Sequence, residues 1–235
     1  MIIFKSINKL NNKVDFKAKI GFVPTMGALH KGHISLIKKS KRISHKTLVS
    51  IYVNPTQFNK KKDFSSYPRN LKKDIQLLKK LKVDYLLIPK NDEVYKDKKR
   101  MKILIPKKDK ILCAKYRPGH FEGVLAVINQ FLINLKPKYL FLGEKDYQQI
   151  YLIKKFVKKH FKIKIINCKI IRINNLLPYS SRNVLLKKKD MIKAKLVSIL
   201  LKKFHLSLKK NLKYSSDLKK IKKIILNENI KIDYF

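Results

Sequence analysis

Two histidines and two glycines in the segment PTMGALHKGH, residues 24–33, could carry phosphate chemistry. His30 and His33 are three residues apart, so they share one face if a helix has begun there. Gly27 and Gly32 remove side chains where the backbone could approach a ligand. A helix N-terminus suits a phosphate, and two imidazoles there could donate hydrogen bonds to charge that grows on phosphate oxygens. No Walker-type GK[ST] follows. We therefore predict a different kind of phosphate site, the alternative being two ordinary loop histidines.

Apolar runs typical of strands alternate with segments of helical periodicity along most of the chain. The strand-like runs are residues 20–25, 47–54, 83–89, 138–143 and 162–170, and the helical patterns are 32–44, 70–81, 122–135 and 146–160. Asn70 is the expected N-cap of its helix. This alternation predicts an α/β fold, a Rossmann-like parallel sheet with helices on both faces. Such sheets bind ligands beyond the carboxyl ends of their strands, which is where PTMGALHKGH would lie.

The alternation stops after about residue 170. A loop, RINNLLPYSSRN, precedes two helix-like stretches at about residues 187–205 and 216–227. We therefore predict a Rossmann-like domain over residues 1–170 and a small C-terminal domain over 171–235.

The chain of 235 residues has a formal net charge of +43, with 58 Lys and Arg against 15 Asp and Glu. Only six of the basic residues are arginine, although the planar guanidinium reads phosphates better than an ammonium. The lysines form no single arm and no patch interleaved with aromatic residues. We therefore predict a solvated lysine-rich surface rather than a specific nucleic-acid site. Such a charge still favours weak, nonspecific binding to polyanions.

The remaining composition indicates a cytoplasmic protein without a membrane segment. The segment MIIFKSINKLNN at the start has no secretory apolar core, and the longest apolar run is interrupted by Asn129, Gln130 and Asn134. Cys113 and Cys168 are too few for a disulfide framework or a structural zinc site.

The segment PTMGALHKGH resembles the HxGH signature of the nucleotidyltransferase superfamily and, over its full length, the corresponding segment of the pantothenate synthetase (pantoate–β-alanine ligase) family. Further motifs of that family follow in the same order: SIYVNPTQFN (50–59), YPRN (67–70), RPGHFEGV (117–124), GEKDYQQ (143–149) and SSRN (180–183). The resemblance covers about residues 20–185.

The resemblance implies a ligase that couples the carboxylate of pantoate to the amine of β-alanine. ATP would first adenylate pantoate and release pyrophosphate, and β-alanine would then release AMP. Adenylation is needed because a carboxylate is a poor acyl donor. The first step gathers negative charge, so it calls for hydrogen-bond donors, cations and Mg²⁺. The family also implies a homodimer.

The resemblance assigns His30, His33, Lys145 and Arg182 to catalysis. His30 and His33 would contact the ATP phosphates, with His33 the expected proton donor to the leaving group. The other expected ATP-binding residues are Met26, Gly27, Ala28, Leu29, Lys31, Gly32, Gly143, Glu144, Asp146, Ile171, Tyr179, Ser180 and Ser181. Gly143 would let the nucleotide approach, and Asp146 could accept hydrogen bonds from ribose hydroxyls.

Three amides are expected to bind pantoate and β-alanine: Asn54, Gln57 and Gln149. An uncharged amide can bond hydroxyls and a carboxylate without neutralising the nucleophile. For Asn54 the alternative is an ordinary strand-ending turn. Arg117 and His120 either line the site or anchor a loop.

Two further roles concern the metal and the lid. Asp74 is a candidate ligand for Mg²⁺, and the competing interpretation is an exposed helix carboxylate. Ser180, Ser181 and Arg182 would clasp the triphosphate from the small domain. The stretch before them departs from the family pattern at Asn175, Leu176 and Pro178, and the family's small domain usually continues further. We therefore expect a shortened lid.

Two other functions remain open from the sequence. Another HxGH nucleotidyltransferase would transfer a nucleotide and stop. A polyanion-binding protein on an inactive enzyme fold would bind RNA without forming AMP.

Overall fold

The computed structural model describes residues 1–95, 103–174, 176–209 and 214–234. The chain divides into two compact units, residues 1–170 and 171–235.

The first unit is built on a six-stranded sheet in which every paired strand is parallel to its neighbour, in the order β1-β4-β3-β2-β5-β6. The strands are β1 (Ile2–Phe4), β2 (Ile20–Thr25), β3 (Lys46–Ile51), β4 (Tyr85–Leu87), β5 (Tyr139–Gly143) and β6 (Lys164–Cys168). The Rossmann-like parallel sheet predicted from the strand–helix alternation is therefore confirmed. The edge strand β1 was not predicted, because three residues are too few to show a period.

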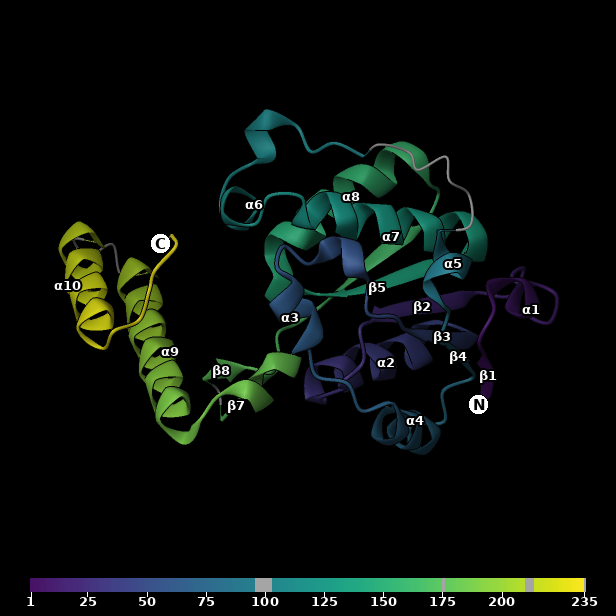
Figure 1. Cartoon of the computed structure of the whole chain (residues 1–235), viewed down its shortest axis with the longest axis horizontal. Coiled ribbons are helices and arrows are strands. Elements are labelled where there is room, and N and C mark those ends of the chain that lie inside the picture. Colours follow the sequence, from purple (N-terminus) through teal and green to yellow (C-terminus); the bar gives the residue numbers. More distant parts are fainter. Residues whose placement is uncertain (96–102, 175, 210–213, 235) are drawn as a thin grey trace. The chain divides into compact units, whose positions relative to one another are not determined.

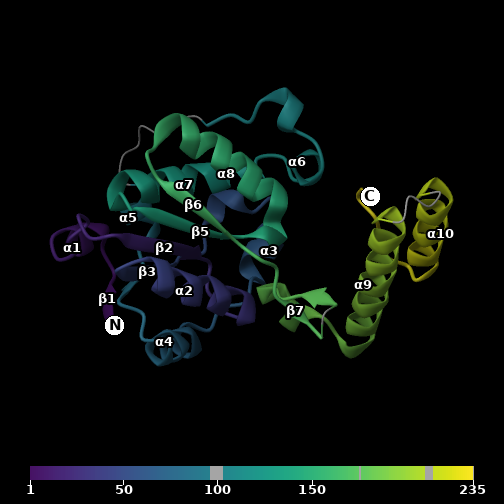
Figure 2. The same ribbon diagram turned by 180° about the vertical axis from the view of Figure 1, so that it is seen from behind.

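Helices cover both faces of this sheet, with α2 and α4 on one side and α7 and α8 on the other (Figures 1 and 2). The helices of this unit are α1 (Ile7–Asn11), α2 (Lys31–Ile43), α3 (Lys61–Ser65), α4 (Leu71–Lys80), α5 (Asn91–Val94), α6 (Cys113–Tyr116), α7 (His120–Leu135) and α8 (Tyr147–His160). Short 3₁₀ helices are η1 (Pro55–Gln57), η2 (Lys107–Asp109) and η3 (Glu144–Asp146). The Asn70 side chain accepts a hydrogen bond from the Lys73 backbone N–H, which confirms it as the N-cap of α4.

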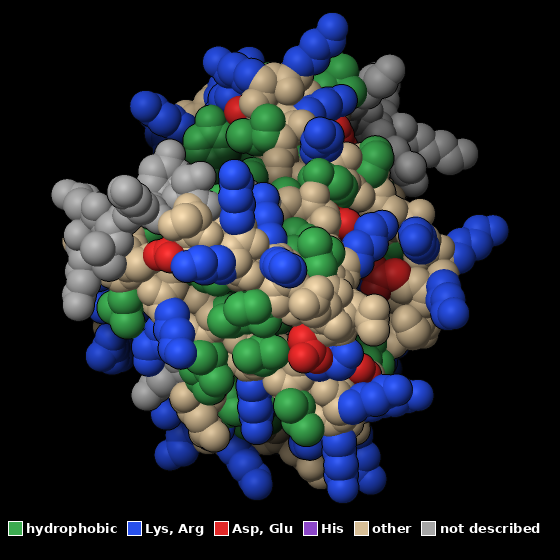
Figure 3. Space-filling view, turned by 90° about the vertical axis from the view of Figure 1, so that its left-hand side faces the viewer, with side chains coloured by type: hydrophobic (Ala, Val, Ile, Leu, Met, Phe, Trp, Pro, Cys, Tyr) green, Lys and Arg blue, Asp and Glu red, His purple; other side chains and the backbone are tan. Residues whose placement is uncertain are grey.

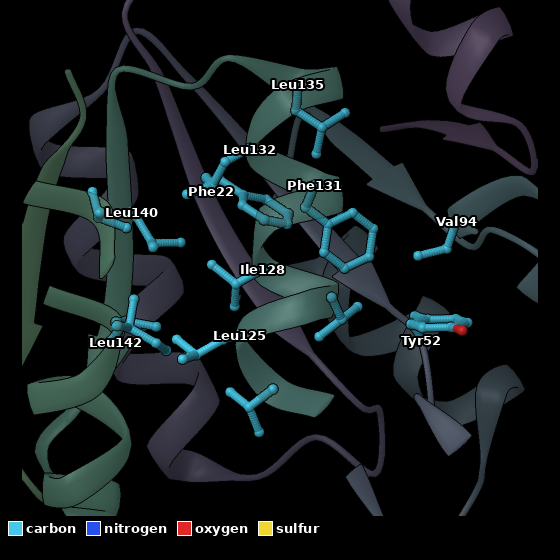
Figure 4. Close-up of a cluster of buried hydrophobic side chains, with 14 of the residues drawn as sticks. Phe22, Tyr52, Val94, Leu125, Ile128, Phe131, Leu132, Leu135, Leu140 and Leu142 are labelled. Atoms are coloured by element: carbon cyan, nitrogen blue, oxygen red, sulfur yellow. The ribbon is translucent and has the colours of Figure 1, made fainter. Parts of the chain in front are cut away.

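Each face of the sheet has its own apolar core. On the α7 side, the Phe22 and Phe131 rings meet edge to face at 5.5 Å between centroids, and Leu132 and Leu140 are fully buried (Figure 4). On the α2 side, the smaller core includes Ile37 and Leu78. Burial on both faces explains why the strands are apolar throughout rather than alternating.

The second unit contains a two-stranded antiparallel hairpin followed by helices. The elements are β7 (Arg172–Ile173), β8 (Leu177–Pro178), η4 (Ser181–Leu185), α9 (Lys188–Lys209) and α10 (Tyr214–Asn227). The two helices lie close to their predicted positions. Of the residues that depart from the family pattern, Asn175 lies outside the described residues, whereas Pro178 ends β8.

Basic side chains are spread over the face of the protein that Figure 3 shows. On the face shown in Figure 3, Lys and Arg lie among apolar and other side chains rather than in one area. Among the helices that the structure describes, none is both long and apolar enough to span a membrane.

Candidate active site

Three of the sequence motifs follow the carboxyl ends of neighbouring strands. β2 pairs with β3 on one side and with β5 on the other. PTMGALHKGH begins in the last two residues of β2, GEKDYQQ begins at the last residue of β5, and the Asn54–Gln57 loop lies shortly after β3. The chain runs outward from β2 through β3 to β4, and then from β5 to β6, so the strand order reverses between β2 and β5. A parallel α/β sheet binds its ligand at this kind of switch point.

The turn that leads from β2 into α2 has an unusual backbone. Gly27 and Ala28 have φ angles of +78° and +48°. The Asp74 carboxylate accepts one hydrogen bond from Ala28 N–H and one from Leu29 N–H, each at 2.8 Å, with its two different oxygens. Asp74 is only 3% exposed, so the alternative of an exposed helix carboxylate is wrong.

Asp74 does not belong to a metal site formed by the described residues. Both carboxylate oxygens already accept hydrogen bonds from the backbone. Within the described ranges, no three His, Cys, Asp or Glu side chains come together as a metal site. The described residues therefore do not form a site that would hold Mg²⁺ by the protein alone, which would need several oxygen ligands.

The two histidines are stacked, with 4.0 Å between ring centroids. His30 is the N-cap of α2, and its Nδ1 accepts from Gly32 N–H at 3.1 Å. The Nδ1 of His33 accepts from His30 N–H at 3.3 Å. In a neutral imidazole the nitrogen that does not accept carries the proton, so these bonds assign an Nε2–H to both rings.

The surroundings keep both rings uncharged. Burial, together with the nearby Lys145 cation, lowers the pKa of His30 to about 4. Burial lowers the pKa of His33 to about 3, with further contributions from His30 and Lys145. A neutral imidazole donates a hydrogen bond but is a poor acid. The lowered pKa values therefore favour hydrogen-bond donation by His33 over the proton donation that we expected of it.

These lowered pKa values predict a pH-dependent stability. As the pH falls below 6.5, the unfolded chain takes up protons on His30 and His33 before the folded chain does. The free energy of unfolding should therefore fall as the pH is lowered from about 6.5 to 4.5. Most of this range lies above the pH at which Asp and Glu carboxylates titrate. Urea unfolding at several pH values measures this slope. The double variant His30→Asn/His33→Asn should have a shallower slope, and equal slopes in the two proteins would contradict the assignment.

The lysine of GEKDYQQ, Lys145, acts electrostatically on both histidines. Lys145 is exposed and pairs with the Asp146 carboxylate at 3.0 Å. Its charge lowers the pKa of both His30 and His33, whereas Asp146 raises that of His30. The tertiary structure thus brings two sequence motifs together around the stacked rings.

The loop after β3 meets the same turn. The Gln57 amide donates from Nε2 to the Sδ of Met26 at 2.7 Å, and its Oε1 accepts from Asn54 Nδ2 at 3.3 Å. Gln57 is 8% exposed. The predicted pantoate amide therefore lies beside a predicted nucleotide residue.

Asn54 makes several internal hydrogen bonds. It is 1% exposed, and its Nδ2 donates to the Gly123 carbonyl at 3.0 Å. Its Oδ1 accepts from Thr56 Oγ1 at 3.0 Å and from the Tyr95 hydroxyl at 2.9 Å. Asn54 thus caps η1 with its side chain, and the substrate contact expected of it stays a prediction.

His120 anchors the Gln57 loop. Arg117 has only donors, so its Nη1 donates to His120 Nε2 at 3.0 Å. The opposite nitrogen, Nδ1, then donates to the Gln57 carbonyl at 2.6 Å. Of the two roles open for His120, loop anchoring fits.

A Cβ on Gly123 would overlap the Thr56 carbonyl, a close approach whose only sequence signal is a glycine inside a helix.

The remaining expected residues lie on other elements. Gln149 is half-buried in the first turn of α8. In the second unit, Ser180 caps η4, because its Oγ accepts from Arg182 N–H at 3.3 Å and its own N–H donates to Asn183 Oδ1 at 2.6 Å. Tyr179 N–H donates to the Ile171 carbonyl, and Ser181 is 8% exposed. The expected ATP contacts of Tyr179, Ser180, Ser181 and Arg182 stay predictions, and so does the expected pantoate contact of Gln149.

A family model described as pantoate-beta-alanine ligase matches residues 2–235. The pantothenate synthetase of Francisella tularensis subsp. novicida (strain U112) is 50% identical over 182 residues, which are 76% of this chain and 69% of that protein. The chain belongs to the pantoate-beta-alanine ligase family. It is therefore a ligase.

Two solved structures of pantoate-beta-alanine ligases show the same fold. The crystal structure from Francisella tularensis, complexed with beta-gamma ATP and beta-alanine, has a TM-score of 0.82 at 46% identity and covers 86% of this chain and 79% of that one. Pantothenate synthetase from Thermus thermophilus has a TM-score of 0.89 at 29% identity, covering 95% of this chain and 81% of that one.

Proposed function

We propose that this ligase condenses pantoate with β-alanine through a pantoyl adenylate. A pantoate carboxylate oxygen attacks the α-phosphorus of ATP, forms the acyl–phosphate bond and expels pyrophosphate. The amine of β-alanine then attacks the acyl carbon, loses a proton and expels AMP. The family assignment supports the ligation, and the Francisella tularensis ligase complexed with ATP and β-alanine supports these two substrates.

The observation that carries this proposal is the pair of neutral imidazoles at the switch point of the sheet. Their Nε2–H groups would donate to phosphate oxygens as charge develops on the pyrophosphate that leaves. Lys145 would add a cation to the same oxygens. Mg²⁺ would accompany the ATP phosphates and neutralise part of their charge, since the described residues do not form a cage for it.

Gln57 would hold pantoate, and the buried network around it would fix the position of its amide. Asn54 binds the side chain of Gln57, and His120 binds its backbone carbonyl. Gln149 would supply the second amide. Ser181 and Arg182 would close on the triphosphate from the small unit, which we propose acts as a lid.

One assay tests the function against its alternatives. Purified protein is incubated with ATP, pantoate and β-alanine, and each substrate is omitted in turn while AMP and pyrophosphate are measured. We expect pantoate-dependent ATP–pyrophosphate exchange and β-alanine-dependent release of AMP. Nucleotide transfer that ignores β-alanine would point to another HxGH nucleotidyltransferase. RNA binding without any AMP would point to a polyanion-binding protein.

We also propose that the protein is a cytoplasmic homodimer. Sedimentation tests the dimer, and cell fractionation tests the location.

The two glutamines should affect pantoate more than ATP. Gln57→Ala or Gln149→Ala leaves substrate hydroxyls and carboxylate without a partner, so the KM for pantoate should rise about tenfold or more while the KM for ATP changes little. Steady-state kinetics with each substrate varied separately measures both values. The matched control is Gln76→Ala, an exposed glutamine on α4. Equal losses for both substrates would indicate a folding defect instead.

A further inference from the structure

The turn that carries the two histidines needs support from outside itself. Gly27 and Ala28 are consecutive residues in the left-handed region of the backbone, which is unfavourable for alanine. Two successive N–H groups, of Ala28 and Leu29, converge on one carboxylate. Successive backbone N–H groups in such a conformation form a small anion-binding concavity. Here the anion is a side chain of the protein.

That carboxylate is supplied by a different element. Asp74 lies in the first turn of α4, where the helix N-terminus favours a negative charge. It is 45 and 46 residues away in sequence from the two N–H groups that it binds. A Cβ on Gly27 would lie 3.0 Å from Asp74 Oδ2, so the turn packs directly against the carboxylate.

The bond to Leu29 adjoins the hydrogen bonds that fix the histidines. The next residue, His30, donates its N–H to His33 Nδ1 and accepts from Gly32 with its own Nδ1. A shift of the backbone at residues 28–29 would therefore move the donor that sets the tautomer of His33.

We propose that Asp74 is a positioning residue that holds the turn over residues 27–30 so that both histidines keep their Nε2–H donors in place. The inference about catalysis rests on the proposed function. Asp74 would touch neither ATP nor pantoate, and it would act only through the backbone N–H groups of Ala28 and Leu29.

The variant Asp74→Asn tests this directly, because it keeps the shape of the side chain but replaces one acceptor by a donor that opposes an N–H group. We expect kcat for pantoate-dependent adenylation to fall about 10–100-fold, since a small misplacement of a catalytic group has an effect of this size. The KM values for ATP and pantoate should stay within about threefold. Hydrogen exchange of the Ala28 and Leu29 amides should become faster.

A matched control separates positioning from loss of stability. Asp109 is another buried carboxylate, 5% exposed, which pairs with Lys155 at 2.6 Å on a different segment. Asp109→Asn should lower the melting temperature but leave kcat and the exchange of Ala28 and Leu29 unchanged. None of these measurements needs the more disruptive variant Asp74→Ala, so all of them can be made on Asp74→Asn even where the alanine variant does not fold.

The Mg²⁺ dependence separates positioning from metal binding. If Asp74 acts through the turn, the Mg²⁺ concentration that gives half-maximal rate should be the same in Asp74→Asn and the wild type. A shift of about tenfold would overturn the proposal in favour of a metal ligand. Unchanged kcat, or unchanged amide exchange at Ala28 and Leu29, would also overturn it.

Failure of the proposed function would look different. If the wild-type protein shows no pantoate-dependent exchange, that function is wrong, and the amide exchange together with the ¹⁵N shifts of the His30 and His33 rings then decides about Asp74. A changed His33 tautomer in Asp74→Asn would support positioning, and unchanged rings would overturn it.

Discussion

Replacing His33 by alanine should lower the rate of pantoate adenylation by about 10²–10³, the size of effect seen when one donor to a developing oxyanion is removed. The reason is that the Nε2–H of His33 would be lost at the point where charge grows on the leaving pyrophosphate. Rapid measurement of ATP–pyrophosphate exchange gives this rate without the second step. His33→Gln, which retains an N–H donor on a longer side chain, should recover part of the loss.

Another histidine provides the control for this experiment. His45 lies just beyond the opposite end of α2 and is exposed. His45→Ala should therefore keep nearly normal adenylation and a normal melting curve. Near-normal adenylation in His33→Ala would show that the central assignment of the HxGH segment is wrong.

Lys145→Ala should lower the adenylation rate about 10–10²-fold, because hydrogen bonds to charged groups contribute about 1.5–3 kcal/mol. Its partner would be a phosphate of the bound ATP, next to the two histidines whose pKa values its charge lowers. The same substitution should raise the pKa of His30 and His33, since the Lys145 cation lowers both. Single-turnover kinetics and NMR titration of the two rings measure these effects separately.

The matched control for Lys145 is Lys154, an exposed lysine on the adjoining helix α8. Lys154→Ala should leave turnover within a few-fold at about 0.15 M salt, where exposed charges more than about 8 Å apart are largely screened. The neighbouring Lys155 is unsuitable as a control, because its ammonium pairs with the buried carboxylate of Asp109. A loss in Lys154→Ala as large as in Lys145→Ala would make the general surface charge, not Lys145, responsible.

The sequence alone predicted the elements whose signal is local. Apolar runs and helical periodicity placed most strands and helices of the first unit, and the resulting alternation predicted the parallel sheet. The HxGH segment also stood out locally, because its histidines and glycines lie within ten residues of one another after a strand. The short edge strand β1 was missed because it acquires its conformation from pairing with β4.

The protonation state and the hydrogen-bond partners of the site residues were decided only by the tertiary structure. Asp74 was expected to be exposed or to bind a metal, yet it binds the backbone of a turn more than forty residues earlier. Asn54 is buried against Gly123 of α7, a contact that no local pattern encodes. The neutral state of His30 and His33 depends on burial and on Lys145 from another loop. Residue type and spacing therefore determined which groups could do the chemistry, whereas their protonation and hydrogen bonds depend on desolvation and contacts between distant segments, which arise only when the chain folds.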